Sequence, residues 1–174
     1  MKILVLGPNA PLLLPILGAS MVAESNEPID VYELDQIGCE AIISFGYRYK
    51  ISDRILEHIN GNAINFHISL LPWNRGSNPN FWSWIENTPK GVSAHWVSSN
   101  IDYGDLVSQA EVGFEQDETL RSSYDKLMKT ATSLVSDFWI NHGFENAPRR
   151  PQPEGGSTHT QSQFNYYSHV LRLG

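Results

Sequence analysis

The segment "NFHISLLPWNRG", residues 65–76, places Asn65 and His67 two positions apart at the end of an apolar run. The run itself, residues 63–67, has the composition of a buried β-strand. Side chains two positions apart on a strand project from the same face, so these two should point into one cleft. An asparagine amide and a protonated histidine both donate hydrogen bonds. Two such donors on a rigid element can hold the oxyanion of a tetrahedral intermediate in acyl transfer.

A candidate carboxylate follows in "SSNIDYGD", residues 98–105. A histidine that is protonated near neutral pH usually needs an anion beside it. Asp102 is the first candidate, because the Tyr-Gly pair after it lets the backbone turn closely, and Asp105 is the alternative. The chosen carboxylate could also receive the proton lost by an attacking nucleophile, directly or through a water. Asn-x-His and Asp before Gly also occur in ordinary turns, so these dipeptides alone leave a structural role open.

Predicted strands and helices alternate on both sides of these motifs. Such alternation predicts an α/β fold with a mainly parallel sheet, whose ligand sites lie beyond the carboxyl ends of its strands. Three prolines between residues 8 and 20 indicate a late helix or an irregular packed segment there. Strands are predicted at residues 2–7, 29–34, 41–46, 63–67, 91–99 and 105–114, and helices at 52–61, 78–87 and 117–142.

The length of 174 residues indicates one catalytic domain, predicted at residues 1–146. Residues 147–174 are rich in proline, glycine and polar side chains, and they are expected to form a surface tail. The aromatic end of this tail, "FNYYSHV", should dock on this domain or on a partner. A homodimer is therefore expected, since short domains often bury exposed aromatic side chains against a second copy of the chain.

Bulk composition narrows the class of partner and the compartment. The net charge of -7 disfavours nucleic acid, whose affinity rests on lysine and arginine, although a local basic spot could still hold the phosphates of a small substrate. The single cysteine, Cys39, cannot form an internal disulfide and fits a reducing cytoplasm. The apolar run at residues 11–17 is too short to span a bilayer and lacks the flanks of a signal peptide. A cytoplasmic protein without membrane contact is expected.

The amino-acid sequence of a longer region resembles that of a known family. "NFHISLLPWNRGSNP", and later "GVSAHWVSSNIDYGDLVSQ", resemble the formyltransferases that use 10-formyltetrahydrofolate as formyl donor. The resemblance runs from about residue 41 to residue 109 and more faintly to residue 144. It implies a Rossmann-like domain with a twisted, mainly parallel sheet. The N-terminal half should be abridged, because only 64 residues precede Asn65 and no G-x-G-x-x-G turn follows the first strand.

The same resemblance assigns roles in the reaction. Asn65, His67 and Asp102 match the catalytic asparagine, histidine and aspartate of the family, and His95 matches a further histidine that we place on the substrate side. The implied reaction is attack of a primary amine on the formyl carbon, with release of tetrahydrofolate. No metal is implied.

The pocket for the folate is also implied by the resemblance. "FGYRYKIS" resembles the segment whose backbone receives the pterin ring, and the loop 97–102 resembles the opposite wall. Core packing remains the alternative for the two tyrosines. The implied cofactor-binding residues are Gly46, Tyr47, Arg48, Tyr49, Lys50, Val97 and Ile101.

The acceptor is indicated by "LPWNRGSNPNFWSWIENTPKG", residues 71–91. This stretch resembles members that act on nucleotide-linked amino sugars, and also formylation domains of peptide synthetases. We favour the amino sugar, with an aminoacyl or small amine, hydrolysis of the donor, or a non-catalytic scaffold as alternatives. Helix packing is the alternative role for the tryptophans of this stretch. The implied acceptor-binding residues are Arg75, Asn78, Asn80 and Trp82, with His95.

Overall fold

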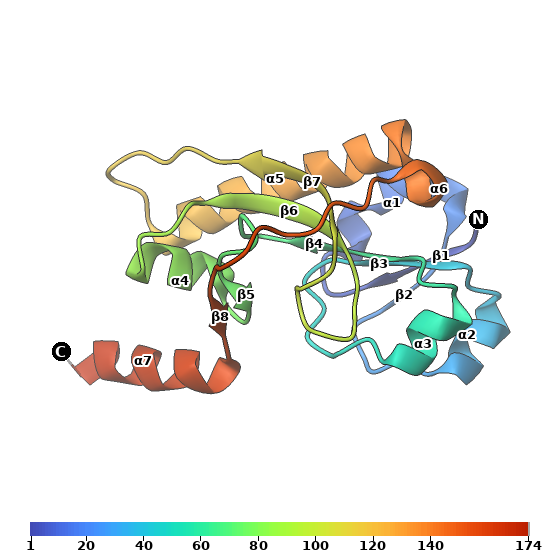
Figure 1. Cartoon of the computed structure of the whole chain (residues 1–174), viewed down its shortest axis with the longest axis horizontal. Coiled ribbons are helices and arrows are strands. Elements are labelled where there is room, and N and C mark those ends of the chain that lie inside the picture. Colours follow the sequence, from blue (N-terminus) through green and yellow to red (C-terminus); the bar gives the residue numbers. More distant parts are fainter. Residues whose placement is uncertain (174) are drawn as a thin grey trace.

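A computed structural model describes residues 1–173 of the chain. Eight strands and the helices between them build a layered α/β molecule (Figure 1). The strands are β1 (Ile3–Leu6), β2 (Met21–Ser25), β3 (Ala41–Ser44), β4 (Ala63–His67), β5 (Arg75–Gly76), β6 (Gly91–Trp96), β7 (Leu106–Glu111) and β8 (Thr158–His159). The α-helices are α1 (Leu14–Leu17), α2 (Val31–Ile37), α3 (Asp53–His58), α4 (Pro79–Ile85), α5 (Leu120–Asn141), α6 (Gly143–Asn146) and α7 (Gln161–Leu173), with 3-10 turns η1 (Ala10–Leu12) and η2 (Gly18–Ser20).

Six strands form the central sheet in the order β2-β1-β3-β4-β6-β7. The first four strands are parallel to one another, whereas β4 pairs antiparallel with β6, and β6 antiparallel with β7. The prediction of an α/β fold with a mainly parallel sheet is therefore confirmed. Strand β4, which carries the Asn-x-His motif, lies inside the sheet between β3 and β6, where its position is fixed from both sides.

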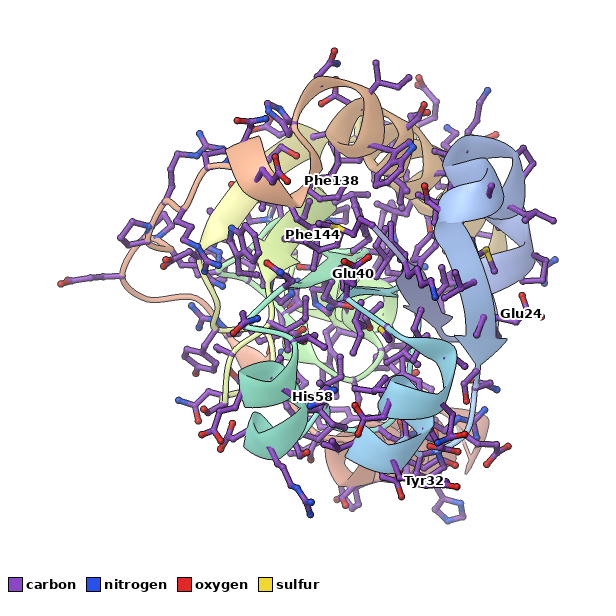
Figure 2. The ribbon with its side chains drawn as sticks, turned by 90° about the vertical axis from the view of Figure 1, so that its right-hand side faces the viewer. Glu24, Tyr32, Glu40, His58, Phe138 and Phe144 are labelled. Atoms are coloured by element: carbon purple, nitrogen blue, oxygen red, sulfur yellow. The ribbon has the colours of Figure 1, made fainter. Side chains whose placement is uncertain are left out.

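Helices cover both faces of this sheet. On one face α1 and α5 bury an apolar stripe that includes Leu17, Leu127 and Phe138, and on the other α2 and α3 bury Leu34 and Ile55. Figure 2 shows Phe138 and Phe144 on one side of the sheet, with His58 and Tyr32 on the other. The parallel strands β1 and β3, which are buried along their whole length, are accordingly apolar except for Ser44 at the end of β3.

Two local predictions fail near the N-terminus. Residues 29–34 do not form a strand but lead into α2, which begins after Asp30. The side chain of Asp30 accepts from the backbone of Glu33, and Glu33 reciprocates, which is a capping box that stabilises the first helical turn. The strand β2 was not predicted, because it lies at the sheet edge with alternating exposure and follows a proline-rich segment.

The segment after residue 146 crosses the molecule and forms β8 and α7. Strand β8 pairs in parallel with β5, and Phe164 and Tyr167 of α7 pack edge-on against Phe81 and Trp82 of α4. This secondary structure was not predicted from the sequence, although the docking of the aromatic end on the same chain was one of the two expectations. Within residues 1–173, no helix is both long and apolar enough to cross a membrane.

Candidate active site

A pocket of about 1450 Å³ opens beyond the carboxyl ends of β3 and β4. Its walls come from four parts of the chain: the turns after β1 and β3, the loop after β6, helices α4 and α5, and the C-terminal helix α7. Pockets for one drug-sized ligand hold about 300–1000 Å³. The volume is therefore large enough for two substrates side by side.

Asn65, in the middle of β4, forms a cluster with Asp102 and His95. Its amide Nδ2 donates to Asp102 Oδ1 at 3.2 Å and lies 3.1 Å from His95 Nε2. The other ring nitrogen of His95 lies 2.9 Å from the carbonyl of Trp96 and donates to it, so in neutral His95 Nε2 is free to accept from Asn65. Both amide hydrogens of Asn65 are thus engaged inside the cluster.

His67 lies across the same cluster, as the two-residue spacing on a strand requires. Its Nε2 is 2.9 Å from the backbone carbonyl of Asn74, which can only accept, so Nε2 carries a hydrogen. Its Nδ1 faces Asp102 Oδ2 at 3.7 Å and becomes a donor when the ring is protonated. The backbone contact therefore fixes which nitrogen of His67 faces the pocket.

Asp102 lies at the centre of these contacts and is buried. Its Oδ1 is 3.3 Å from His95 Nε2, and its Oδ2 accepts from the backbone N–H of Gly76 at 2.7 Å. Burial alone would raise the pKa of Asp102, but the charge of His67, the contacts with His95 and the Gly76 N–H together hold this pKa well below its usual range. Asp102 is therefore a carboxylate at all ordinary pH values.

The residues expected to bind the folate all line this pocket. Tyr47 and Tyr49 pack edge-on at 5.5 Å between ring centroids, and the Tyr47 hydroxyl donates to the carbonyl of Glu27. Tyr47 also packs against the apolar core beneath α2 and α3, so it serves both the core and the wall. The residues of this group at the pocket are Gly46, Tyr47, Arg48, Tyr49, Lys50, Val97 and Ile101.

The residues expected near the acceptor divide into two groups. Asn78, Asn80 and His95 line the pocket. Arg75 and Trp82 do not: Arg75 is 5% exposed and bonded to the C-terminal segment, and Trp82 stacks on His159 at 4.1 Å. They therefore lie outside the lining of this pocket, because residues 150–160, whose course no local pattern predicts, cover β5 and α4.

Asp105, the alternative carboxylate, does not reach the cluster. It borders a separate, smaller hollow together with Arg75 and Tyr103. The structure thus brings Asp102, and not Asp105, to Asn65 and His67. For the residues that the structure describes, no group of three or more His, Cys, Asp or Glu side chains is arranged to hold a metal ion.

Several residues in or behind the pocket wall were missed by the sequence analysis. Asn74 orients His67 through its carbonyl, and Gly76 donates to Asp102, although both lie inside the quoted motif. Asn9, in the turn after the first strand, also lines the pocket, and its place after a predicted strand end was a usable signal. Phe164 and Leu171 of α7 also line the pocket, but no local sequence pattern predicts that α7 approaches it.

The arrangement is suited to acyl transfer. Asn65 and His67 are hydrogen-bond donors on one strand end, and Asp102 is an ionised acceptor within reach of both. Donors placed where negative charge develops stabilise a tetrahedral intermediate, and a nearby carboxylate removes the proton of the nucleophile.

Comparisons with known proteins agree with this chemistry. The family model described as "Formyl transferase" matches residues 20–138. The formyltransferase PseJ from Anoxybacillus kamchatkensis, solved with UDP-4,6-dideoxy-4-formamido-L-AltNAc and tetrahydrofolate, is 36% identical with a TM-score of 0.87, over 98% of this chain and 92% of that one.

More distant structures share the fold. A sugar N-formyltransferase from Shewanella sp. is 20% identical with a TM-score of 0.81, over 95% of this chain and 79% of that one. Phosphoribosylglycinamide formyltransferase from Streptococcus pneumoniae is 19% identical with a TM-score of 0.65, over 78% of this chain and 95% of that one. With the family model covering more than half of the chain and a relative at 36% identity over nearly all of it, the protein belongs to the formyltransferase family and has its Rossmann-like fold.

Proposed function

We propose that this formyltransferase moves a formyl group from 10-formyltetrahydrofolate to the primary amine of a nucleotide-linked amino sugar. The observation that carries the proposal is the cluster of Asn65, His67 and Asp102 at the floor of a pocket large enough for two substrates. The relative at 36% identity, PseJ, holds both tetrahydrofolate and a UDP-linked formamido sugar. The corresponding acceptor for this chain is a UDP-linked 4-amino-4,6-dideoxy sugar.

The pocket divides between the two substrates. The turn after β3 and the loop after β6 supply the folate side, with the backbone from Gly46 to Lys50 facing Val97 and Ile101. Helices α4, α5 and α7 supply the other side, where Arg121 adds a cation. Asn78 and Asn80 shape this wall, and the side chain of Asn78 bonds to Gln161, while that of Asn80 bonds to Leu120 and Ser123. Since the catalytic cluster lies between these walls, the formyl carbon and the amine meet above Asn65.

The reaction begins with attack of the neutral amine on the formyl carbon. Protonated His67 donates from Nδ1 to the oxygen that becomes negative, while Nε2 stays bound to the Asn74 carbonyl. Asp102 accepts the amine proton directly or through a water. Because its contacts hold the pKa of Asp102 well below the usual range, Asp102 passes this proton on rather than keeping it.

His95 is the group that receives the proton from Asp102, since its Nε2 lies 3.3 Å from Oδ1. Once protonated, this nitrogen no longer accepts from Asn65 and donates to Asp102 instead. One amide hydrogen of Asn65 is then released toward the oxyanion. When the intermediate collapses, the proton moves to N10 of the leaving tetrahydrofolate, and the sugar amine keeps the formyl group.

The test is consumption of 10-formyltetrahydrofolate by the purified protein in three parallel assays. One contains no amine, one a UDP-linked 4-amino-4,6-dideoxy sugar, and one an aminoacyl carrier substrate. We expect turnover with the amino sugar alone, abolished in Asp102→Asn. Turnover without any amine would instead show a hydrolase, turnover with the carrier would show the wrong acceptor class, and no folate binding would leave a non-catalytic scaffold.

The finer expectations on location and assembly also remain proposals. We propose a cytoplasmic enzyme that acts on small molecules and not on nucleic acid, in line with the net charge of -7. We propose residues 1–146 as the catalytic domain with residues 147–174 completing its pocket, and a homodimer that covers the exposed Tyr166 and Val170 of α7. Light scattering at high protein concentration tests the dimer, and a monomer there would refute it.

A further inference from the structure

A strap of ten residues, 150–159, runs behind the active site and joins two of its parts. At one end the backbone of Arg150 pairs with Leu106, at the start of β7. At the other end β8 pairs with β5, next to the catalytic cluster. The strap lies outside the residues matched by the family model. We propose that Gln152, within this strap, is a positioning residue for Asp102 and that Arg75 orients it. The inference rests on the proposed function, in which Asp102 accepts the amine proton.

Gln152 holds the backbone of the loop that carries Asp102. Its amide Nε2 donates to the carbonyl of Asp102 at 2.7 Å and to the carbonyl of Gly104 at 2.9 Å. Asp102 has a φ of 60°, in the left-handed region that residues other than glycine disfavour. Gly104 approaches the carbonyl of Trp96 so closely that a Cβ there would clash. The two hydrogen bonds from Gln152 therefore support a turn that the loop would not favour alone.

Arg75 determines which way the Gln152 amide points. Its Nε and Nη2 donate to Gln152 Oε1 at 3.0 and 2.8 Å, and its Nη1 donates to the carbonyl of Gly155 at 3.2 Å. The guanidinium also lies over the Tyr103 ring, 3.9 Å from its centroid. Because an arginine can only donate, the amide oxygen must face Arg75 and the NH₂ must face the Asp102 loop. Arg75 thus acts inside the scaffold and not on the acceptor.

The far end of the strap holds the other partner of Asp102. The backbone N–H of Arg75 donates to Ser157, and that of Ser77 donates to His159, both at 2.9 Å. Gly76, between these two bonds, gives its own N–H to Asp102 Oδ2 at 2.7 Å. The strap therefore fixes both the backbone of Asp102 and the donor that its carboxylate faces. A shift of either end would move this carboxylate relative to His95 and the amine.

Gln152→Glu is the variant that separates positioning from packing. The new carboxylate keeps an oxygen for Arg75, and with it the anchoring of the strap, but sets its second oxygen against the carbonyls of Asp102 and Gly104. We expect kcat to fall by about 10- to 100-fold while the KM values of donor and acceptor stay within about twofold, because misplacement of a reacting group by ~1 Å costs rate rather than binding. The matched control is Gln36→Glu, an exposed position on α2, which should retain the wild-type kcat.

A double-mutant cycle checks that the effect passes through Asp102. If Gln152 acts by positioning this carboxylate, Gln152→Glu should cost less rate in the Asp102→Glu background, which keeps a carboxylate but already misplaces it, than in the wild type. Three results would overturn the proposal. The fold-losses of kcat in the two single variants could multiply in the double variant. Gln152→Glu could keep a kcat within about twofold of wild type, or it could raise KM without lowering kcat.

A second readout needs no turnover, so it still decides the matter if the proposed acceptor is wrong. The ¹³C signal of the Asp102 carboxyl, assigned by its loss in Asp102→Asn, reports the ionisation of this group directly. The wild-type carboxyl should stay ionised throughout the acidic range in which the protein is folded. In Gln152→Glu the Asp102 carboxyl should titrate at higher pH, because it is no longer aligned with the Gly76 N–H. Gln152→Ala takes the place of this variant if Gln152→Glu does not fold. Absence of wild-type turnover would refute the proposed function alone, and an unchanged titration would refute the role of Gln152.

Discussion

At Asp102, burial and charge act in opposite directions on one carboxyl group. Burial favours the protonated form, whereas His67, His95 and the N–H of Gly76 favour the carboxylate, and the net effect holds the pKa well below its usual range. A carboxylate of this kind is protonated only transiently. The same three contacts link the chemistry of the site to the stability of the fold, since each is lost on unfolding.

The two donors of the cluster give the first prediction at this scale. Asn65→Ala and His67→Ala should each lower the formylation rate by about 10²- to 10³-fold, because each removes a donor that faces the developing oxyanion. Single-turnover rates with saturating donor and acceptor measure this directly. His58→Ala, on the surface of α3, is the control that should leave the rate unchanged. A rate within about tenfold of wild type for either cluster variant would contradict the assignment.

The lowered pKa of Asp102 predicts a pH dependence of stability. An unfolded aspartate has a pKa of about 3.9, so a folded value below this adds stability above about pH 4 that is lost as the pH falls further. Asp102→Asn lacks this contribution. The difference in unfolding free energy between wild type and this variant should therefore shrink as the pH falls below about 4. Urea titrations across this range measure it, and a difference of constant size down to pH ~3 would count against the ionised carboxylate.

At the scale of elements, what could be predicted follows from how local each signal is. The strand at 63–67 and the helix at 117–142 were predicted because their apolar periodicity lies within one stretch of sequence. The prediction of a strand at residues 29–34 was wrong. The β-branched and aromatic residues there are typical of a strand, but Asp30 and Glu33 form a capping box that starts a helix. The two-residue strands β5 and β8 have no periodicity, and they join residues 83 positions apart, so no local pattern could reveal the strap.

The capping box of α2 gives a prediction for this element. Asp30→Ala should lower the free energy of unfolding by about 1 kcal/mol, because the first turn of α2 loses the acceptor for its free N–H groups. The formylation rate should be unchanged, since α2 packs on the face of the sheet away from α5 and does not line the pocket. Chemical denaturation of Asp30→Ala beside the conservative Asp30→Asn measures the effect. Equal stability of wild type and Asp30→Ala would argue against the helix start.

Across the whole molecule, the sheet separates two apolar cores and carries the site at one end. Phe138 is fully buried between Phe66 of β4 and Phe144 of α6, with ring centroids 6.0 and 5.3 Å away. It thus joins the long helix to the strand that carries Asn65 and His67. The core beneath α5 therefore supports the position of the catalytic strand.

This packing predicts a large loss of stability in Phe138→Ala. Removing a buried phenylalanine side chain costs about 3–5 kcal/mol, since the transfer free energy is lost and a cavity remains. Ile140→Ala, on the same helix but 74% exposed, is the matched control and should change stability by less than about 0.5 kcal/mol. Urea unfolding of the two variants measures both values. A similar loss in both would mean that α5 is not seated on the sheet as described.

The most direct test of the central claim follows the formyl group itself. The protein is incubated with 10-formyltetrahydrofolate labelled with ¹³C in the formyl group and with a UDP-linked 4-amino-4,6-dideoxy sugar, and the label is followed by NMR. The account predicts that the label appears as a formamide on the sugar nitrogen, at a rate that Asp102→Asn abolishes. Label recovered as free formate, or transferred equally well by Asp102→Asn, would contradict it.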